Sequence, residues 1–117
     1  KLPWNELRMA DTDELSLGES TSPLPFDEPT AVIRFQCTSE SLVGSDDTVI
    51  AVHRLTYSGA SITDDSTVLT ITWPGNTRQY SVLCDISFTT SQKLQLVCTS
   101  PGAHALLNVK PIGSSLN

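Results

Sequence analysis

The stretch RQYSVLCDISF, residues 78–88, alternates large apolar side chains with mostly small or polar ones along its whole length. Because successive side chains of a β-strand point to opposite faces, this period of two predicts a strand with one face buried. Ser and Thr supply 15 and 14 of the 117 residues, and strong helix formers are sparse after the first twenty positions, which also favours strands. The side chains predicted to point inward are Tyr80, Val82, Cys84, Ile86 and Phe88.

The same alternation recurs on both sides of this stretch. In the strand nearest the N-terminus, Ile33, Phe35 and Cys37 share the predicted inward phase, and Val32 falls in the outward phase. The run at 48–57 is apolar in both phases at its start, which predicts a β-bulge or a position between two layers. The further predicted strands are 31–38, 48–57, 67–73, 93–99 and 104–110. The inward phases of the last three hold Leu69, Ile71 and Trp73, then Leu94, Leu96 and Cys98, then Ala105, Leu107 and Val109.

Two Pro-Gly pairs mark connections between these strands. Trp73-Pro74-Gly75-Asn76 and Ser100-Pro101-Gly102-Ala103 each place Pro second and Gly third, which is the signature of a type II turn. Residues 67–110 therefore predict a four-stranded antiparallel meander. With the two strands nearer the N-terminus, at least six short strands are expected. That number is enough for an all-β antiparallel sandwich or a small jelly-roll-like barrel.

Charge is concentrated near the N-terminus. Residues 1–28 hold seven acidic residues against Lys1 and Arg8, a net charge of −5, whereas residues 29–117 hold six acidic and five basic residues, a net charge of −1. Residues 21–29 contain three prolines, which favours an extended, semi-rigid linker. We therefore predict an acidic, Pro-containing arm at 1–29 and a β-sandwich domain at 30–117. Since the chain begins with Lys1 rather than Met, we expect it to be part of a longer protein.

The composition argues against two classes of partner. A formal net charge of −6 would repel a phosphate backbone, so nucleic-acid binding is not expected. No apolar run approaches the roughly 20 residues that cross a bilayer, and no basic amphipathic stretch is present. Membrane insertion is therefore not expected either.

The residues that most often carry catalysis are few, and they lack the spacing of known sites. The three cysteines fall in inward phases, where an unpaired cysteine acts as a small hydrophobic side chain; a bridge from Cys37 to Cys84 or Cys98 is the alternative. The two histidines, His53 and His104, are accompanied by neither a Gly-x-Ser-x-Gly elbow nor a zinc-ligand spacing. We therefore do not expect an enzyme, and we expect both histidines at the surface or at strand ends. For His53, which follows an apolar run, the alternative is a partly buried side chain bonded to a backbone carbonyl.

Two acidic pairs offer candidate binding sites. Asp46-Asp47 lies within 41–47 and Asp64-Asp65 within 58–66, both predicted as connecting loops. Like charges repel there, and Ca²⁺ would relieve the repulsion by gathering carboxylate and carbonyl oxygens if the two loops converge. The alternative is two solvated turns, in which Asp is common. The candidate metal ligands are Asp46, Asp47, Asp64 and Asp65, and the candidate binding residues are Ser45, Asp46, Asp47, Ser61, Thr63, Asp64 and Asp65.

Val68, Leu83 and Val97 are apolar side chains in predicted outward phases. We expect at least one of them to lie in an oligomer interface or beneath the N-terminal arm. Symmetric association is the commonest way in which such domains assemble, and the nearly neutral body at 29–117 can approach a copy of itself without large charge repulsion. A homo-oligomer is therefore expected.

The layout of the chain resembles the protruding domain of small icosahedral RNA virus capsid proteins of the nodavirus and tombusvirus type. The features that carry the resemblance are the acidic, Pro-containing segment 21–29, the Ser/Thr-rich strands of 31–110 and the odd number of cysteines. The resemblance implies a spike on the virion surface, assembled in the host cytoplasm, that forms dimers within a shell and attaches to a host surface protein or glycan. It also implies Ca²⁺ at loop aspartates, which here maps only onto Asp46, Asp47, Asp64 or Asp65.

Two other hypotheses are open. An immunoglobulin-like extracellular adhesion module would need a disulfide, although Trp73 lies far beyond Cys37 and Leu96 stands where that family has its tyrosine. An enzyme or a carbohydrate-binding module would use His53 or His104.

Overall fold

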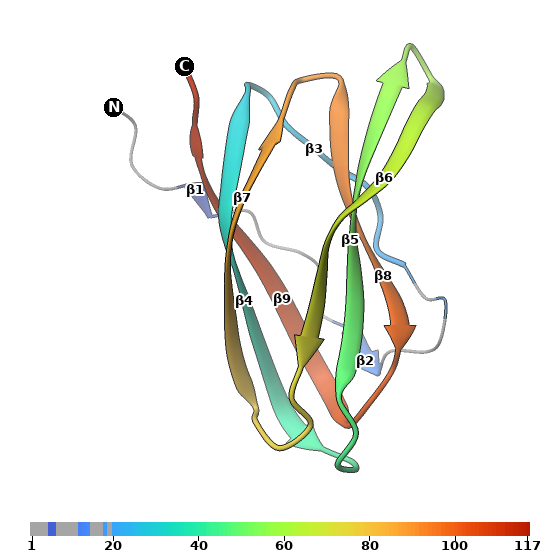
Figure 1. The fold of residues 1–117 in the computed structure, drawn as a ribbon, viewed down its shortest axis with the longest axis vertical. Helices are drawn as coiled ribbons and strands as arrows, with labels where there is room; N and C mark the ends of the chain where they lie inside the picture. The colour runs from blue at the N-terminus through green and yellow to red at the C-terminus, as the bar shows by residue number, and fades with distance from the viewer. Residues whose placement is uncertain (1–4, 7–11, 15–17, 19) are drawn as a thin grey trace.

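The computed structural model describes residues 5–6, 12–14, 18 and 20–117, and these residues form strands joined by short turns and loops (Figure 1). No helix occurs in them, so none could cross a membrane in this part of the chain. The strands are β1 (Asn5–Glu6), β2 (Thr12–Glu14), β3 (Leu24–Pro25), β4 (Thr30–Leu42), β5 (Thr48–Ser58), β6 (Ser61–Trp73), β7 (Gln79–Phe88), β8 (Gln92–Ser100) and β9 (His104–Ser115).

The strands form two antiparallel sheets. One has the order β1-β9-β4-β7, with β2 also on β9, and the other has the order β3-β8-β5-β6. Because β1 and β2 pair with successive parts of β9, they act as two parts of one edge strand. Only β5 and β6 then form a hairpin, and every other connection passes from one sheet to the other, which is the arrangement of a jelly roll. The predicted all-β sandwich is confirmed.

The predicted meander over 67–110 is wrong. Strands β6 and β8 belong to one sheet, whereas β7 and β9 belong to the other, so both Pro-Gly turns carry the chain across the sandwich. A Pro-Gly turn only reverses the local direction of the backbone and is compatible with either destination. The type II turn predicted at 73–76 is also wrong, because Gly75 lacks the positive φ of that turn, whereas Gly102 has a φ of 60°. The chain crosses between the sheets because the inward-facing side chains of all four strands are buried in one common core.

The core between the sheets contains the side chains that the alternation placed inward. Ile86 and Phe88 of β7 are buried, and Tyr80, Val82 and Cys84 are half-buried against the core. Nearer the N-terminus, Phe26 stacks on Phe88 with ring centroids 4.7 Å apart. The largest fully buried side chains are Trp73, Phe35, Phe88, Ile71, Leu94, Val32 and Val52. The inward sets predicted for β8 and β9 are buried as well: Leu94, Leu96, Cys98, Ala105, Leu107 and Val109.

The predicted phase of β4 is wrong at its start. Val32 is fully buried, whereas Ile33 is only half-buried. The pairing of β4 with both neighbours shifts register between Val32 and Arg34, so two residues separate the inward Val32 from the inward Phe35. A β-bulge inserts a residue in this way and breaks a strict period of two. The irregularity predicted for 48–57 is confirmed, because β5 shifts register at three places.

The predicted loop at 58–66 is mostly strand. Ser58 pairs with Ser61, so Gly59 and Ala60 alone form the turn, and Gly59 adopts a φ of 62°. Residues 61–65 are exposed on both faces. A strand that lies beyond the core shows no apolar alternation, which is why the sequence pattern did not indicate one here.

The described residues before β4 lie along the two sheets. Gly18 N donates to Cys98 O (2.8 Å), Thr21 N donates to Leu96 O (2.9 Å), and Ser20 pairs with Val97, so this segment runs beside β8 as a further strand of the sheet. That Val68, Leu83 or Val97 lies beneath the arm or in an oligomer interface stays a prediction. Within 21–29, Leu24 and Pro25 pair with β8, Phe26 is buried in the core, and the backbone bends at Asp27 and Glu28. The domain division at residue 29 stays a prediction, and residues 1–4, 7–11, 15–17 and 19 of the arm lie outside the described residues.

Candidate functional site

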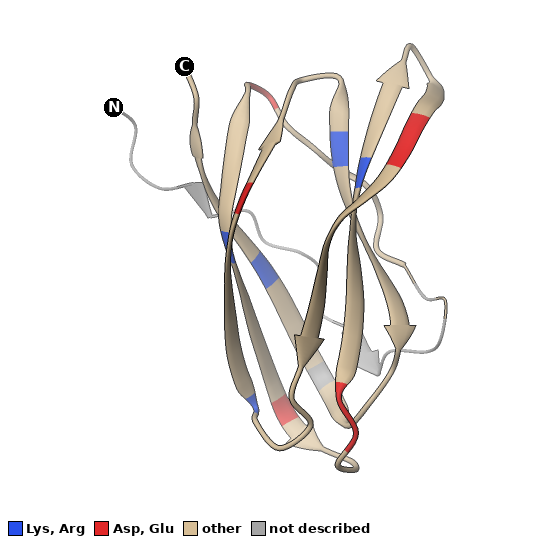
Figure 2. Ribbon diagram, viewed as in Figure 1, with Lys and Arg blue, Asp and Glu red and all other residues tan. Residues whose placement is uncertain are grey.

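The two predicted acidic pairs lie at opposite ends of the sandwich (Figure 2). Asp46 and Asp47 precede β5, whereas Asp64 and Asp65 lie on β6 opposite Thr56 and Leu55. Leu55 is seven residues along β5 from its first residue, about 23 Å at roughly 3.3 Å per residue. The structure therefore does not bring the four aspartates together, and one Ca²⁺ ion cannot be bound by both pairs. Within the described residues, no three His, Cys, Asp or Glu side chains cluster as metal ligands.

The β4–β5 loop is held by its backbone. Val43 N donates to Ala103 O (2.7 Å), and Ala103 N donates to Asp46 O (3.0 Å). Asp47 Oδ1 accepts a hydrogen bond from Gly75 N (3.0 Å), so this carboxylate holds the turn between β6 and β7. Ser45 is exposed. Asp47 thus has a structural partner, and the loop is a packed part of the sandwich end.

A buried ring pair lies beneath this loop. His104 is 2% exposed and stacks on Trp73 with ring centroids 3.7 Å apart. Its Nε2 lies 2.7 Å from Thr77 O, and because a carbonyl only accepts, Nε2 carries the proton; its Nδ1 lies 2.7 Å from Thr48 Oγ1. Trp73 Nε1 donates to the same Thr77 carbonyl (3.1 Å). His104 is therefore a satisfied core residue, out of reach of a ligand.

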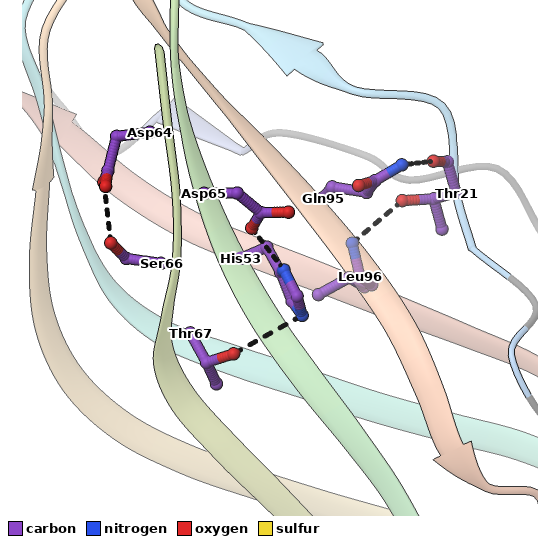
Figure 3. A network of polar contacts seen from close by, with 8 residues as sticks. All are labelled: Thr21, His53, Asp64, Asp65, Ser66, Thr67, Gln95 and Leu96. Carbon is purple, nitrogen blue, oxygen red and sulfur yellow. Dashed lines mark hydrogen bonds and ion pairs between the residues drawn. The ribbon is translucent and has the colours of Figure 1, made fainter. Parts of the chain in front are cut away.

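The other histidine lies on the outer surface of the second sheet (Figure 3). His53 Nδ1 is 2.6 Å from Asp65 Oδ1, and the two side chains are 21% and 51% exposed. His53 Nε2 is 3.5 Å from Thr67 Oγ1. Register shifts on β5 and β6 place His53 opposite Thr67, so all three groups lie together on one face of the hairpin.

Further polar side chains lie on the opposite face of β6, where Asp64 and Ser66 point away from Asp65, and on β8 (Figure 3). Ser66 Oγ donates to Asp64 Oδ2 (2.7 Å), and Thr63 Oγ1 donates to Thr56 O (3.3 Å). Gln95 faces His53 in the ladder, and its Nε2 donates to Thr21 O (3.0 Å). We name the following set the hairpin polar surface: Ser61, Thr63, Asp64, Asp65, Ser66, Thr67, His53 and Gln95.

The hairpin polar surface contains four of the predicted binding residues and four that the prediction missed. Ser61, Thr63, Asp64 and Asp65 were indicated by the Ser/Thr/Asp composition of the stretch. Ser66, Thr67, His53 and Gln95 were missed because their place depends on strand register. For His53, the bulges of β5 hide the phase that would have indicated an outward side chain.

The order Asp65, His53, Thr67 is that of a carboxylate–imidazole–hydroxyl triad. The separation of 3.5 Å between His53 Nε2 and Thr67 Oγ1 is longer than the roughly 2.6–3.2 Å of an activated nucleophile. The arrangement offers several hydrogen-bond donors and acceptors at fixed positions on a strand surface. Such groups can bind a hydroxyl-rich or otherwise polar ligand.

The cysteines are packed as small hydrophobic side chains, as predicted. No disulfide joins any two of the three, all of which lie in the described part of the chain. Burial raises the pKa of Cys37 to about 12. Burial, with the nearby charge of Asp85, raises the pKa of Cys84 to about 11, so both thiols stay protonated at neutral pH. The bridge expected from an immunoglobulin-like domain is absent.

Comparison with known proteins identifies no relative. Neither a protein-family model nor a curated protein matches this sequence. The function is therefore argued from the site and the architecture.

Proposed function

We propose that this chain is a non-enzymatic protruding domain of a viral capsid protein, which holds the hairpin polar surface out toward a host glycan. The observation that carries the proposal is the jelly-roll strand order combined with a hairpin whose tip extends beyond the core. Jelly rolls are found in viral capsid domains and in lectins, both of which present surface groups to partners. The setting proposed is therefore the virion surface.

The side chains of the hairpin polar surface suit a sugar better than a flat protein partner. Carboxylates and amides can bind pairs of adjacent hydroxyls, and Asp65 and His53 already hold each other in place. Near the same end, Lys93 Nζ lies 4.5 Å from the centroid of the Tyr57 ring, which adds a cation and an aromatic ring at this end of the sandwich. Exposed groups fixed in this way lose little conformational freedom on binding, so weak polar contacts can still yield affinity.

A carbohydrate-binding module outside a virus is the second candidate, because the same surface and the same fold would serve it. The two candidates differ only in the parent protein. Electron microscopy of the parent chain after expression distinguishes them, since a capsid protein forms closed shells.

Binding to an array of immobilised glycans tests the proposal. We expect this chain to bind at least one glycan and the double variant Asp64→Asn with Asp65→Asn to lose that binding. The matched control is Asp46→Asn at the opposite end, which should bind like the unsubstituted chain. Binding to no glycan, or equal binding by both variants, would contradict the proposal, and capture of a host protein alone would redirect it to a protein receptor.

Ca²⁺ stays a prediction for each acidic pair taken alone. Repeating the array in the presence of a chelator tests it. Loss of binding on chelation, restored by added Ca²⁺, is the outcome expected if an ion bridges Asp64 or Asp65 to the sugar. Unchanged binding would contradict that role.

A further inference from the structure

The two sheets have four edges, and three of them carry features that oppose pairing with another strand. The edge of β6 bears Asp64 and Asp65, and its pairing with β5 shifts register twice. The segment along β8 contains Pro23 and Pro25, and β1 and β2 have only two and three residues. Acidic side chains, prolines, bulges and short strands are the usual means by which natural proteins protect sheet edges.

Strand β7 carries fewer of these features. It has one acidic residue, Asp85, and one register shift in its pairing with β4, but its ten residues include no Pro, Lys or Arg and their exposure alternates without interruption. Among the described strands it pairs only with β4, so it is a long edge strand with one side unpaired and is the least protected of the four edges.

The hydrogen bonds at the two ends of β7 show which peptide groups face its free side. Arg78 O accepts from Ser39 N of β4, whereas Ser87 O accepts from Arg54 Nη1 of the other sheet (3.0 Å). Peptide groups alternate in direction along a strand, so those that share the direction of Ser87 turn away from β4. These free-edge residues are Gln79, Ser81, Leu83 and Asp85.

Leu83 is the most exposed large hydrophobic side chain among the described residues, at 71%. It lies in the middle of β7 and faces outward, as the sequence alternation predicted. One exposed leucine alone is ordinary. Here it lies on the least protected edge, so a strand added to β7 would also cover part of this side chain.

We propose that β7 pairs with β7 of a second copy of this chain, antiparallel and about a two-fold axis. Identical edges are self-complementary in this geometry, because each copy supplies the donors and acceptors that the other needs. A register centred on Val82 pairs all four free-edge residues and leaves Ser87 O with Arg54. It places Asp85 opposite Gln79 and Ser81 opposite Leu83, so no two charges face each other.

The inward side of β7 supports the same occupant. Tyr80, Val82 and Cys84 are only half-buried in one copy although they pack against the core. In the register centred on Val82, these side chains would meet the same three of the partner. The pairing gives the homo-oligomer expected from the sequence a location, and it rests on the proposed function only for its biological setting.

Sedimentation equilibrium of the whole chain tests the pairing. We expect a monomer–dimer equilibrium that Ser81→Pro weakens by about tenfold or more, because each copy loses one intermolecular hydrogen bond. The Ser81 N–H faces away from β4, so this proline leaves the pairing within the sheet in place. The matched control is Ser81→Ala, which retains the N–H and should dimerise like the unsubstituted chain.

A second pair of variants keeps the test decisive if Ser81→Pro does not fold. Leu83→Lys places a charge in the middle of the β7 edge and should give a monomer, whereas Thr72→Lys places the same charge on the exposed part of β6 and should dimerise normally. A monomer at every concentration, or a dimer that neither Ser81→Pro nor Leu83→Lys weakens, would overturn the pairing. Glycan binding by Leu83→Lys reports separately on the proposed function, because β7 contributes nothing to the hairpin polar surface.

Discussion

The two ends of the sandwich carry similar residues and use them differently. At the end that contains Trp73, which we name the Trp73 end, Asp47 holds a backbone N–H and His104 is buried. At the hairpin end, Asp65 and His53 hold each other and remain open to solvent. The same residue types therefore hold the turns and the core at one end and leave hydrogen-bonding groups open to solvent at the other.

The largest expected effect of this difference is on packing. Trp73→Ala removes the largest fully buried side chain and the ring on which His104 stacks. We expect it to lower the free energy of unfolding by about 3–5 kcal/mol, measured by urea denaturation. Ile62→Ala at the hairpin end, where the side chain is 54% exposed, should cost about 0.5 kcal/mol or less. Similar losses for the two variants would break the comparison.

Two glycines with almost the same backbone conformation separate strain from packing. Gly102 has a φ of 60° and Gly59 a φ of 62°. A Cβ at Gly102 would collide with Asp47 O and Thr48 Oγ1, whereas a Cβ at Gly59 meets nothing within 4 Å. We expect Gly59→Ala to cost about 1–2 kcal/mol from the left-handed conformation alone, and Gly102→Ala to cost more, about 3 kcal/mol or above.

Thermal denaturation of both glycine variants measures this difference. The result that would contradict it is an equal loss of stability in the two. In that case the Trp73 end would yield to an added methyl group as easily as the open hairpin does.

The smallest expected difference concerns the two aspartates. Asp47→Ala leaves Gly75 N without its acceptor and should cost about 1 kcal/mol. Asp65→Ala breaks an exposed pair and should cost about 0.5 kcal/mol or less, while removing an acceptor from the hairpin polar surface. In urea denaturation, Asp47→Ala should therefore lose more stability than Asp65→Ala. In glycan binding, Asp65→Ala should lose more affinity than Asp47→Ala. A larger loss of stability in Asp65→Ala would assign a structural role to the hairpin pair.

Much of the fold could be predicted from the sequence where one face of a strand is buried. The inward sets of β7, β8 and β9 follow from alternation alone, because the core lies on one side of each strand. The inward direction of Val32 could not be predicted, because the bulge in β4 reverses the alternation and no residue pattern in the sequence indicates that bulge. The crossing of the Pro-Gly turns depends on contacts between distant strands, which turn chemistry does not encode.

The candidate site shows the same limit. Asp64 and Asp65 were identifiable because adjacent acidic residues stand out in any sequence. Their partner His53 was not, because its position beside Asp65 is set by register shifts between β5 and β6. The opposite roles of the two acidic pairs depend on which end of the sandwich each occupies, and no local pattern reports that.

The place of β9 governs the order in which the chain can fold. Among the described strands β9 is synthesised after all the others, yet it lies inside its sheet between β4 and the edge formed by β1 and β2. Until residues 104–115 have left the ribosome, β1 and β2 have no partner and β4 has one unpaired side. Only the β5–β6 hairpin can form early from neighbouring residues, and the many non-local pairings favour slow folding. A nascent chain that lacks β9 would expose β4 to other chains, so synthesis of residues 104–115 and protection of β4 from aggregation coincide.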